Sequence, residues 1–403
     1  MLAGRLQVWV LLLLLSVGLI AASNEVAEVA VDSDVGKNAP EIIAARGYDM
    51  ETHKVTTSDG YILTMHRLPK SYDESQSGTA AATSKPAVLL QHGIIESSFA
   101  WVCNYRNQSL AFVLADAGYD VGLGNSRGNT YSNESTHYTT DDDEFWDFSW
   151  EDMGLYDLPA MINYVQDTSG RSTISYVGHS QGVTQALVGF AANQTLAKSV
   201  SYFGALAPVS WLGHSKAELF VALADAHLDL LFEGLGVVKL LAHNELLTKF
   251  LAGYTCTAID DICGSAISLL FGTTTSLNIS HVPVLISQTP AGTSVKDIAH
   301  FAQGIRADTF ARFDYGCSCV QALGLSLCAS AICPNKANGA GDTLTEPADL
   351  EQLRSSLPSG TVVHDKTIDI YSHLDFIWAY NANEFVYQDL LAQLATYEGV
   401  SYN

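Results

Sequence analysis

The chain has 403 residues, of which 48% are hydrophobic and 16% are charged, enough apolar material for one large buried core. Twenty basic residues against 43 acidic ones give a formal net charge of −23, which argues against nucleic acid and anionic membrane surfaces as partners. Length and composition favour one α/β domain with an insertion over two independent domains.

The first residues indicate export. Arg5 precedes an apolar run from Val8 to Ile20, and small residues follow it, so we predict a secretory signal peptide over residues 1–23. An uncleaved anchor is the alternative, which the short apolar run disfavours. No later stretch is long and apolar enough to span a bilayer. Four N-glycosylation sequons agree with export, at Asn107, Asn133, Asn193 and Asn278.

A buried strand is predicted in the segment that begins at residue 86 and ends in Gln91-His92-Gly93, where a polar loop follows. The backbone N–H of Ile94, in the loop after this strand, is a candidate donor for an oxyanion hole. We interpret His92 as a structural hydrogen-bonding residue, because it lies too early in the chain to be the base for the serine described next.

The segment 173–193 changes from strand to helix around one serine. Up to Val177 it is rich in β-branched residues, and from Ala186 onward apolar residues recur at helical spacing. Gly178-His179-Ser180-Gln181-Gly182 joins the two and has the pattern of a nucleophile elbow, in which flanking glycines remove Cβ atoms that would collide. Ser180 is therefore the predicted nucleophile, with the Gln181 N–H as second oxyanion donor.

Seven cysteines lie at positions 103, 256, 263, 317, 319, 328 and 333, so one stays unpaired or pairs outside the chain. Cys256 and Cys263 bracket a short acidic segment and are the best candidates for a local disulfide. A zinc site at Cys317-x-Cys319 is disfavoured, because the sequence has no matching second cysteine pair and no histidine close by. We expect no metal and no cofactor.

The C-terminal segment supplies the remaining catalytic candidates, in the hydrolase order of serine, acid, histidine. Asp342 follows a glycine-rich turn, Pro347 opens a predicted helix, a strand is predicted through Ile368, and His373 lies in the loop before a terminal helix. His373 would take the Ser180 proton and Asp342 would orient it. Three other acids compete with Asp342 for its role: Asp365, Asp369 and Asp375. We place Asp369 in the predicted strand. His364 is the alternative to His373 as the base.

The chain resembles the acid lipase family of gastric and lysosomal lipases. The resemblance runs from about residue 39 to 316 and from about 338 to 398, through segments such as "DMETHKVTTSDGYILTMHRLP", "LAFVLADAGYDVGLGNSRGNTYS", "YVGHSQG", "PAGTSVKDIAHFAQGI" and "YSHLDFIW". It implies an α/β-hydrolase fold with a mostly parallel central sheet flanked by helices. It also implies Ser180, Asp342 and His373 as the triad, Ile94 and Gln181 as the oxyanion hole, and activity on the acid side of neutral.

The resemblance further implies an inserted, mainly helical cap. We expect a linker over 24–38, a hydrolase core over 39–209 and 336–403, and the cap over 210–335. Part of this cap is apolar beyond what one buried helical face needs, which fits packing on the core, a lid over an acyl-chain cleft, or both on different faces. Residues 317–335 depart from the family pattern. They are rich in cysteine and show no strand before Asp342, which indicates either a rewritten edge or a sequence error.

The expected activity is that of a serine ester hydrolase acting on triacylglycerols or sterol esters at a lipid–water interface. A short-chain carboxylesterase is one alternative. A catalytically impaired lipid-binding homologue is another, favoured only if residues 317–335 misplace Asp342. The expected destination is the extracellular space or a lysosomal or vacuolar lumen.

Overall fold

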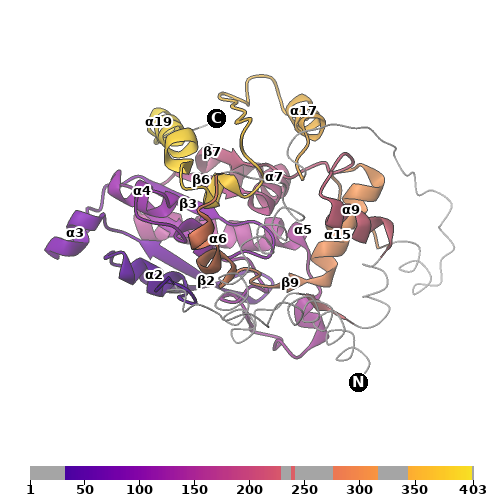
Figure 1. Ribbon diagram of the computed structural model, residues 1–403, viewed down its shortest axis with the longest axis horizontal. Helices are drawn as coiled ribbons and strands as arrows, with labels where there is room; N and C mark the ends of the chain where they lie inside the picture. Colours follow the sequence, from indigo (N-terminus) through magenta and orange to yellow (C-terminus); the bar gives the residue numbers. More distant parts are fainter. Residues whose placement is uncertain (1–31, 228–236, 241–275, 316–343, 402–403) are drawn as a thin grey trace, which may run out of the picture.

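The computed structural model describes residues 32–227, 237–240, 276–315 and 344–401 (Figure 1). Several predictions made above fall outside these ranges: the signal peptide, the Cys256–Cys263 pair, the segment 317–335 and Asp342.

A seven-stranded sheet forms the centre of the molecule, in the order β1-β2-β4-β3-β6-β7, with β5 paired to β2. The strands β4, β3, β6 and β7 run parallel, whereas β1, β2 and β5 pair in the antiparallel sense. Their bounds are β1 Glu51–Thr56, β2 Tyr61–Leu68, β3 Ala87–Gln91, β4 Asp120–Leu123, β5 Glu134–Ser135, β6 Ile174–His179 and β7 Val200–Leu206. The predicted strands before His92 and before Ser180 are thus confirmed as β3 and β6, and the structure shows that they are neighbours.

The sheet is covered by hydrophobic cores on both faces. In β3, Val88 and Leu90 belong to one core and Leu89 to the other, because successive side chains of a strand point to opposite faces. Helices α4 (Leu110–Asp116) and α19 (Gln388–Tyr397) contribute to the first core, and α6 (Leu158–Ser169) to the second. This burial of both faces explains why β3 reads as a continuous apolar run.

Shorter elements connect these layers. Those between β1 and β7 are α3 Tyr72–Ser77, η1 Ser98–Trp101, η2 Asp143–Trp146, α5 Trp150–Asp152, the π-helix η3 Met153–Asp157, α7 Gln181–Ala192 and α8 Gln194–Lys198, with α2 Ala39–Ala45 before them. Those near the C-terminus are α17 Pro347–Ser356, α18 Asp375–Trp378 and the π-helix η7 Asn383–Tyr387. Pro347 begins a helix, as predicted.

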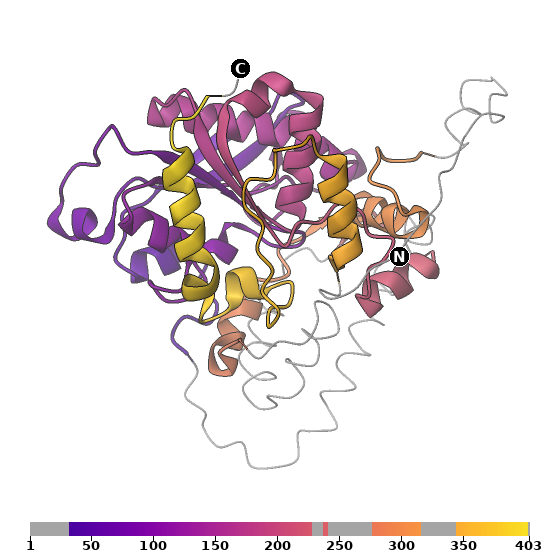
Figure 2. The ribbon, with the colours of Figure 1, turned by 90° about the horizontal axis from the view of Figure 1, so that it is seen from above.

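The described parts of the expected cap are mostly helical. They comprise α9 Glu218–Asp225, η5 Ile279–His281, α14 Val282–Ile286, α15 Val295–Ala307 and a small antiparallel pair of β8 Lys239–Leu240 with β9 Thr293–Ser294. Figures 1 and 2 show α9 and α15 side by side at the end of the molecule opposite α3.

The predicted strand through Ile368 is wrong, and so is the placement of Asp369 within it. Residues 361–368 form no strand, and almost all of them are exposed. Val362 and Val363 are 44% and 53% exposed, so the β-branched residues that suggested a strand have no sheet face to cover. Neighbouring charged residues form surface ion pairs instead, such as that of Asp365 with Arg354.

Cys103 is the single cysteine within the described ranges, and its thiol is free and fully buried. Burial raises the pKa of this thiol far above its usual value. Across the described part of the chain, no helix combines the length and hydrophobicity needed to cross a bilayer.

Candidate active site

The predicted elbow is present between β6 and α7. Ser180 has φ 54° and ψ −119°, a conformation that side-chain-bearing residues rarely adopt. A Cβ on Gly178 would lie 2.7 Å from the carbonyl carbon of Gly182, and one on Gly182 would lie 2.3 Å from the carbonyl oxygen of Gln91. Both glycines are therefore required by close backbone packing, as the sequence predicts.

Ser180 and His373 meet in the folded protein although 193 positions separate them. The distance between Ser180 Oγ and His373 Nε2 is 2.7 Å, a hydrogen bond of the length needed for proton transfer from the hydroxyl to the imidazole. Both residues are buried, at 3% and 1% exposure. Ser180 lies at the N-terminus of α7, where the helix dipole favours negative charge.

The main chain of His373 is attached to the elbow by a second histidine. Nε2 of His179 donates to the carbonyl oxygen of His373 at 2.9 Å, while Nδ1 of His179 lies 3.3 Å from Oε2 of Glu96. Burial raises the pKa of Glu96, but its electrostatic interaction and hydrogen bond with His179, together with the hydrogen bond from the Gly93 N–H, outweigh this effect. The net shift of the Glu96 pKa is downward. Glu96 is thus an ionised carboxylate beside the pair of reacting groups.

The loop after β3 approaches the nucleophile closely. A Cβ on Gly93 would lie 2.9 Å from the Cβ of Ser180, so only glycine fits there. The Gly93 N–H donates to Oε2 of Glu96 at 2.8 Å. Ile95 has φ 53°, and its carbonyl accepts from the Ala291 N–H at 2.6 Å. The backbone of Ile94 is therefore held at a fixed place between two anchored neighbours.

His92 has the structural role expected for it. Its Nδ1 donates to the carbonyl of Gly93 at 2.7 Å, and its Nε2 accepts from the backbone N–H of Ser126 and from the side chain of Asn129. Burial lowers its pKa to about 4, so the ring is neutral over most of the acid range. His92 thereby connects the loop after β3 to the loop after β4.

The loop after β4 is held by a buried arginine. Arg127 is 2% exposed and pairs with Asp157 and Asp59, its Nε lying 2.8 Å from Oδ1 of Asp157. Its backbone N–H also donates to Asp157. Arg127 directly follows Ser126, so this ion-pair network also fixes the backbone N–H of Ser126, from which His92 accepts a hydrogen bond.

A small pocket opens beside the Ser180–His373 pair, and Glu96 and His179 contribute to its polar lining. Apolar contributions come from Ile94, Ile95, Leu374 and Trp378, and Thr289 comes from the segment expected to form the cap. The pocket therefore presents a reactive hydroxyl within a mainly apolar wall, which suits an ester with a hydrocarbon chain.

Helix α15, in the segment expected to form the cap, also contacts the elbow, through Asp297. This fully buried carboxylate accepts from Thr293 Oγ1 at 2.8 Å and lies against the side chain of Gln181. Burial raises its pKa to about 7, and the hydrogen bonds from Thr293, the Trp150 backbone and Gln181 oppose the shift only in part. Gln181 is the first residue of α7, so its backbone N–H has no hydrogen-bond partner within the helix.

Of the competing acids and base, three lie at the surface. Asp365 pairs with Arg354 and His364 with Asp389, all at the surface, and Asp369 is exposed. Asp375 is buried and accepts from the backbone N–H of Ser372 at 2.7 Å. The sequon asparagines 107, 133 and 193 are exposed, and that at 278 is half-buried.

Sequence reasoning missed Glu96 and His179 as supporting residues. A weak signal existed, because His179 lies directly before Ser180 and Glu96 lies in the loop that follows the predicted strand, two positions after Ile94. Their pairing across 83 positions, and the contact of His179 with the loop of His373, follow only from the three-dimensional arrangement.

Comparison with known proteins agrees with this geometry. Residues 39–105 match the family model of a partial alpha/beta-hydrolase lipase region, and residues 86–214 match that of the alpha/beta hydrolase fold. Gastric triacylglycerol lipase of Rattus norvegicus is 37% identical over 374 residues, covering 90% of this chain and 92% of that protein. The "Putative lysosomal acid lipase/cholesteryl ester hydrolase" of Crotalus adamanteus is 36% identical, with the same coverage.

Solved structures agree at the level of the fold. The crystal structure of a "putative lipase" from Sulfolobus solfataricus superposes with a TM-score of 0.52 at 15% identity, covering 86% of this chain and 94% of that one. The extent and identity of the matches to gastric lipases, together with the serine elbow described above, establish that the chain belongs to the acid lipase family of α/β-hydrolases.

Proposed function

We propose that the protein is a lipase that hydrolyses neutral lipid esters, triacylglycerols or sterol esters, through an acyl-enzyme on Ser180. The observation that carries the proposal is the 2.7 Å hydrogen bond between Ser180 Oγ and His373 Nε2 at the elbow. The names of the relatives from Rattus norvegicus and Crotalus adamanteus support the substrate class.

In the proposed reaction His373 accepts the proton of Ser180 as Oγ attacks the ester carbonyl. The resulting oxyanion accepts hydrogen bonds from the backbone N–H groups of Ile94 and Gln181. His373 then returns its proton to the leaving alcohol, and a water molecule deacylates Ser180 by the same steps in reverse. Asp342 is proposed to orient His373 and to stabilise the imidazolium.

The surroundings of the pair support this assignment. Gly93 brings the loop of Ile94 against Ser180, and His179 fixes the main chain of His373, so both halves of the machinery are positioned by the fold before substrate arrives. Removing one oxyanion donor of this kind typically costs about 10²–10³ in rate. We further propose that residues 210–335 form a cap over the site and that the protein enters the secretory pathway by a signal peptide over residues 1–23.

Hydrolysis of triolein, cholesteryl oleate and a short soluble ester, each measured from pH 4 to pH 9, tests the proposal. We expect turnover of at least one long-chain ester to exceed that of the soluble ester, with an optimum below pH 7. Labelling by an ester-like phosphonate should occur in the wild type and disappear in Ser180→Ala. A protein that takes up no phosphonate and cleaves none of the three esters would contradict the proposal.

A further inference from the structure

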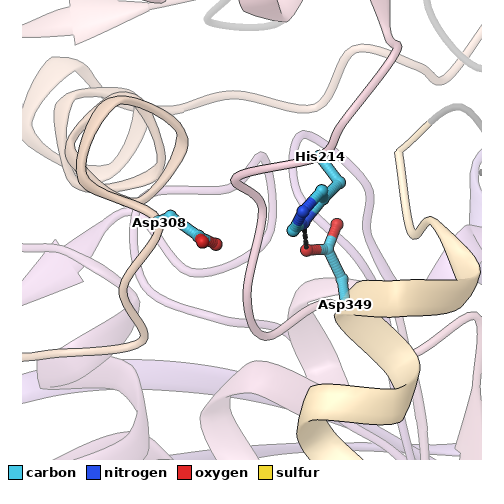
Figure 3. Close-up of side chains that lie close together, drawn as sticks. All are labelled: His214, Asp308 and Asp349. Carbon is cyan, nitrogen blue, oxygen red and sulfur yellow. Dashed lines mark hydrogen bonds and ion pairs between the residues drawn. The ribbon is translucent and has the colours of Figure 1, made fainter. Parts of the chain in front are cut away.

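A histidine and two aspartates from distant parts of the chain gather away from Ser180. Figure 3 shows the carboxylates of Asp308 and Asp349 both directed toward the imidazole of His214. His214 lies in the loop after β7, Asp308 directly follows α15, and Asp349 is in the first turn of α17. The cluster therefore joins the expected cap to the C-terminal part of the core.

The three residues are close enough to share one ion. One ligand atom from each lies within 4.8 Å of the others. Nδ1 of His214 is 2.6 Å from Oδ1 of Asp349. The exposure of His214, Asp308 and Asp349 is 6%, 8% and 1% respectively, so bulk water hardly reaches them.

The His214–Asp349 ion pair leaves part of each side chain unused. Within the described ranges, Nε2 of His214 and Oδ2 of Asp349 are buried and have no hydrogen-bond partner. A buried polar atom without a partner costs about 1–3 kcal/mol, and more where the group is charged. The pair alone does not account for two such atoms in one cluster.

Negative charge accumulates at the same place. The carboxylate of Glu346, three positions before Asp349, is fully buried and has a single described cationic partner, Lys216, at 3.1 Å. Lys216 is 56% exposed at its side chain. The buried carboxylates of Asp308, Glu346 and Asp349 thus concentrate negative charge at this place, and a bound cation would offset it.

The backbone beside His214 leaves space for the Asp308 carboxylate. A Cβ on Gly213 would lie 2.1 Å from Oδ1 of Asp308 and 2.2 Å from its Cγ. Any side chain at position 213 would therefore displace this carboxylate from the cluster.

We propose that His214, Asp308 and Asp349 bind a zinc ion. An imidazole nitrogen with two carboxylate oxygens is a donor set that zinc accepts, whereas calcium and magnesium prefer oxygen ligands alone. Ligand atoms of a tetrahedral zinc site lie about 3.3 Å apart, so the three side chains must move closer by up to about 1.5 Å to bind the ion. The unpartnered nitrogen of His214 and oxygen of Asp349 are available to it as ligand atoms. The fourth position is left to water or to a second carboxylate oxygen. A zinc ion here would differ from the sequence-based expectation of no metal, and its proposed role is structural.

The test uses the full-length secreted chain, purified without a histidine tag, stripped with EDTA and returned to one equivalent of zinc chloride. Bound zinc is measured by mass spectrometry after gel filtration, and thermal unfolding is measured with and without zinc. The variants are His214→Asn and the nearly isosteric Asp308→Asn. His364→Asn is the matched control, since it removes the histidine of an exposed His–Asp pair that has no such cluster around it.

We expect the wild type and His364→Asn to retain one zinc per chain and to unfold at higher temperature with zinc, while calcium and magnesium have no effect. Both cluster variants should lose affinity by about tenfold or more. Asp308→Asn keeps the test valid if His214→Asn does not fold. Absence of zinc-dependent stabilisation in the wild type, or equal zinc retention in all four proteins, would overturn the proposal.

Discussion

Replacing Gly182 with alanine tests whether close backbone packing positions the nucleophile. The added Cβ would lie 2.3 Å from the carbonyl oxygen of Gln91 and 3.0 Å from that of His92. Both obstacles are main-chain atoms of β3 and its loop, so neither can rotate away. About 1 Å of movement is needed to restore ordinary contact distances. The elbow must therefore shift away from β3.

The shift should affect activity more than stability. Overpacking of this kind costs about 1–3 kcal/mol of unfolding free energy. Displacing a nucleophile by about 1 Å costs on the order of 10²-fold in rate, because Ser180 would lose its alignment with both His373 and the loop of Ile94. We therefore expect Gly182→Ala to fold, with a moderately reduced Tm and kcat/KM lower by about 10²-fold.

The assay compares kcat/KM on a soluble nitrophenyl ester with the calorimetric Tm of the same preparation. Gly304→Ala, in helix α15, is the control. Its added Cβ would contact a single atom, the carbonyl oxygen of Thr309, at 3.3 Å. This variant should stay within about twofold of the wild type, as expected for a substitution that adds little strain. If Gly182→Ala folds and retains wild-type kcat/KM, the argument from packing is wrong.

Four further predictions follow from the site and its surroundings. Ser180→Ala should abolish ester hydrolysis without changing secretion or Tm, as measured on the secreted protein. His179→Asn should lower kcat by about tenfold or more while leaving KM unchanged, because it frees the main chain of His373. Burial raises the pKa of Asp297 from 3.8 to about 7, so the folded state binds this proton more tightly than the unfolded state and loses stability as the pH rises from about 4 to 7. In Asp297→Asn, calorimetry should show a smaller decrease of stability over this pH range. Burial lowers the pKa of His66 from 6.5 to about 4, so the folded state loses stability as pH falls through this window; His66→Gln should reduce the loss by about 1–3 kcal/mol at pH 4.

The elbow and its histidine could be predicted because each has a local signature. Two glycines around Ser180, a strand before it and a helix after it specify one turn, and the hydrolase chain order selects His373 from 12 histidines. The strand through Ile368 failed for the opposite reason. Val362 and Val363 have strand propensity, but whether they are buried depends on what lies beside them, which a single sequence does not contain.

Contacts between residues far apart in the chain could not be predicted from the sequence either. Glu96 and His179, or His214 and Asp349, carry no mark in the sequence that relates one to the other. Each pair forms because the sheet order brings together loops that are far apart along the chain. Their roles depend on burial and on distances of a few ångströms, and both are properties of the folded molecule.

Cys103 connects the fold to the maturation of the protein. In the unfolded chain this thiol is one of seven that could exchange in the oxidising compartment proposed above, and an odd number leaves one cysteine without a partner in the chain. Folding removes it from solvent and suppresses the thiolate, the form that attacks disulfides. Six cysteines then remain, an even set. Core formation around Cys103 thus withdraws one thiol from exchange, and reaction of Cys103 itself with a thiol reagent would identify the molecules in which this core has not formed.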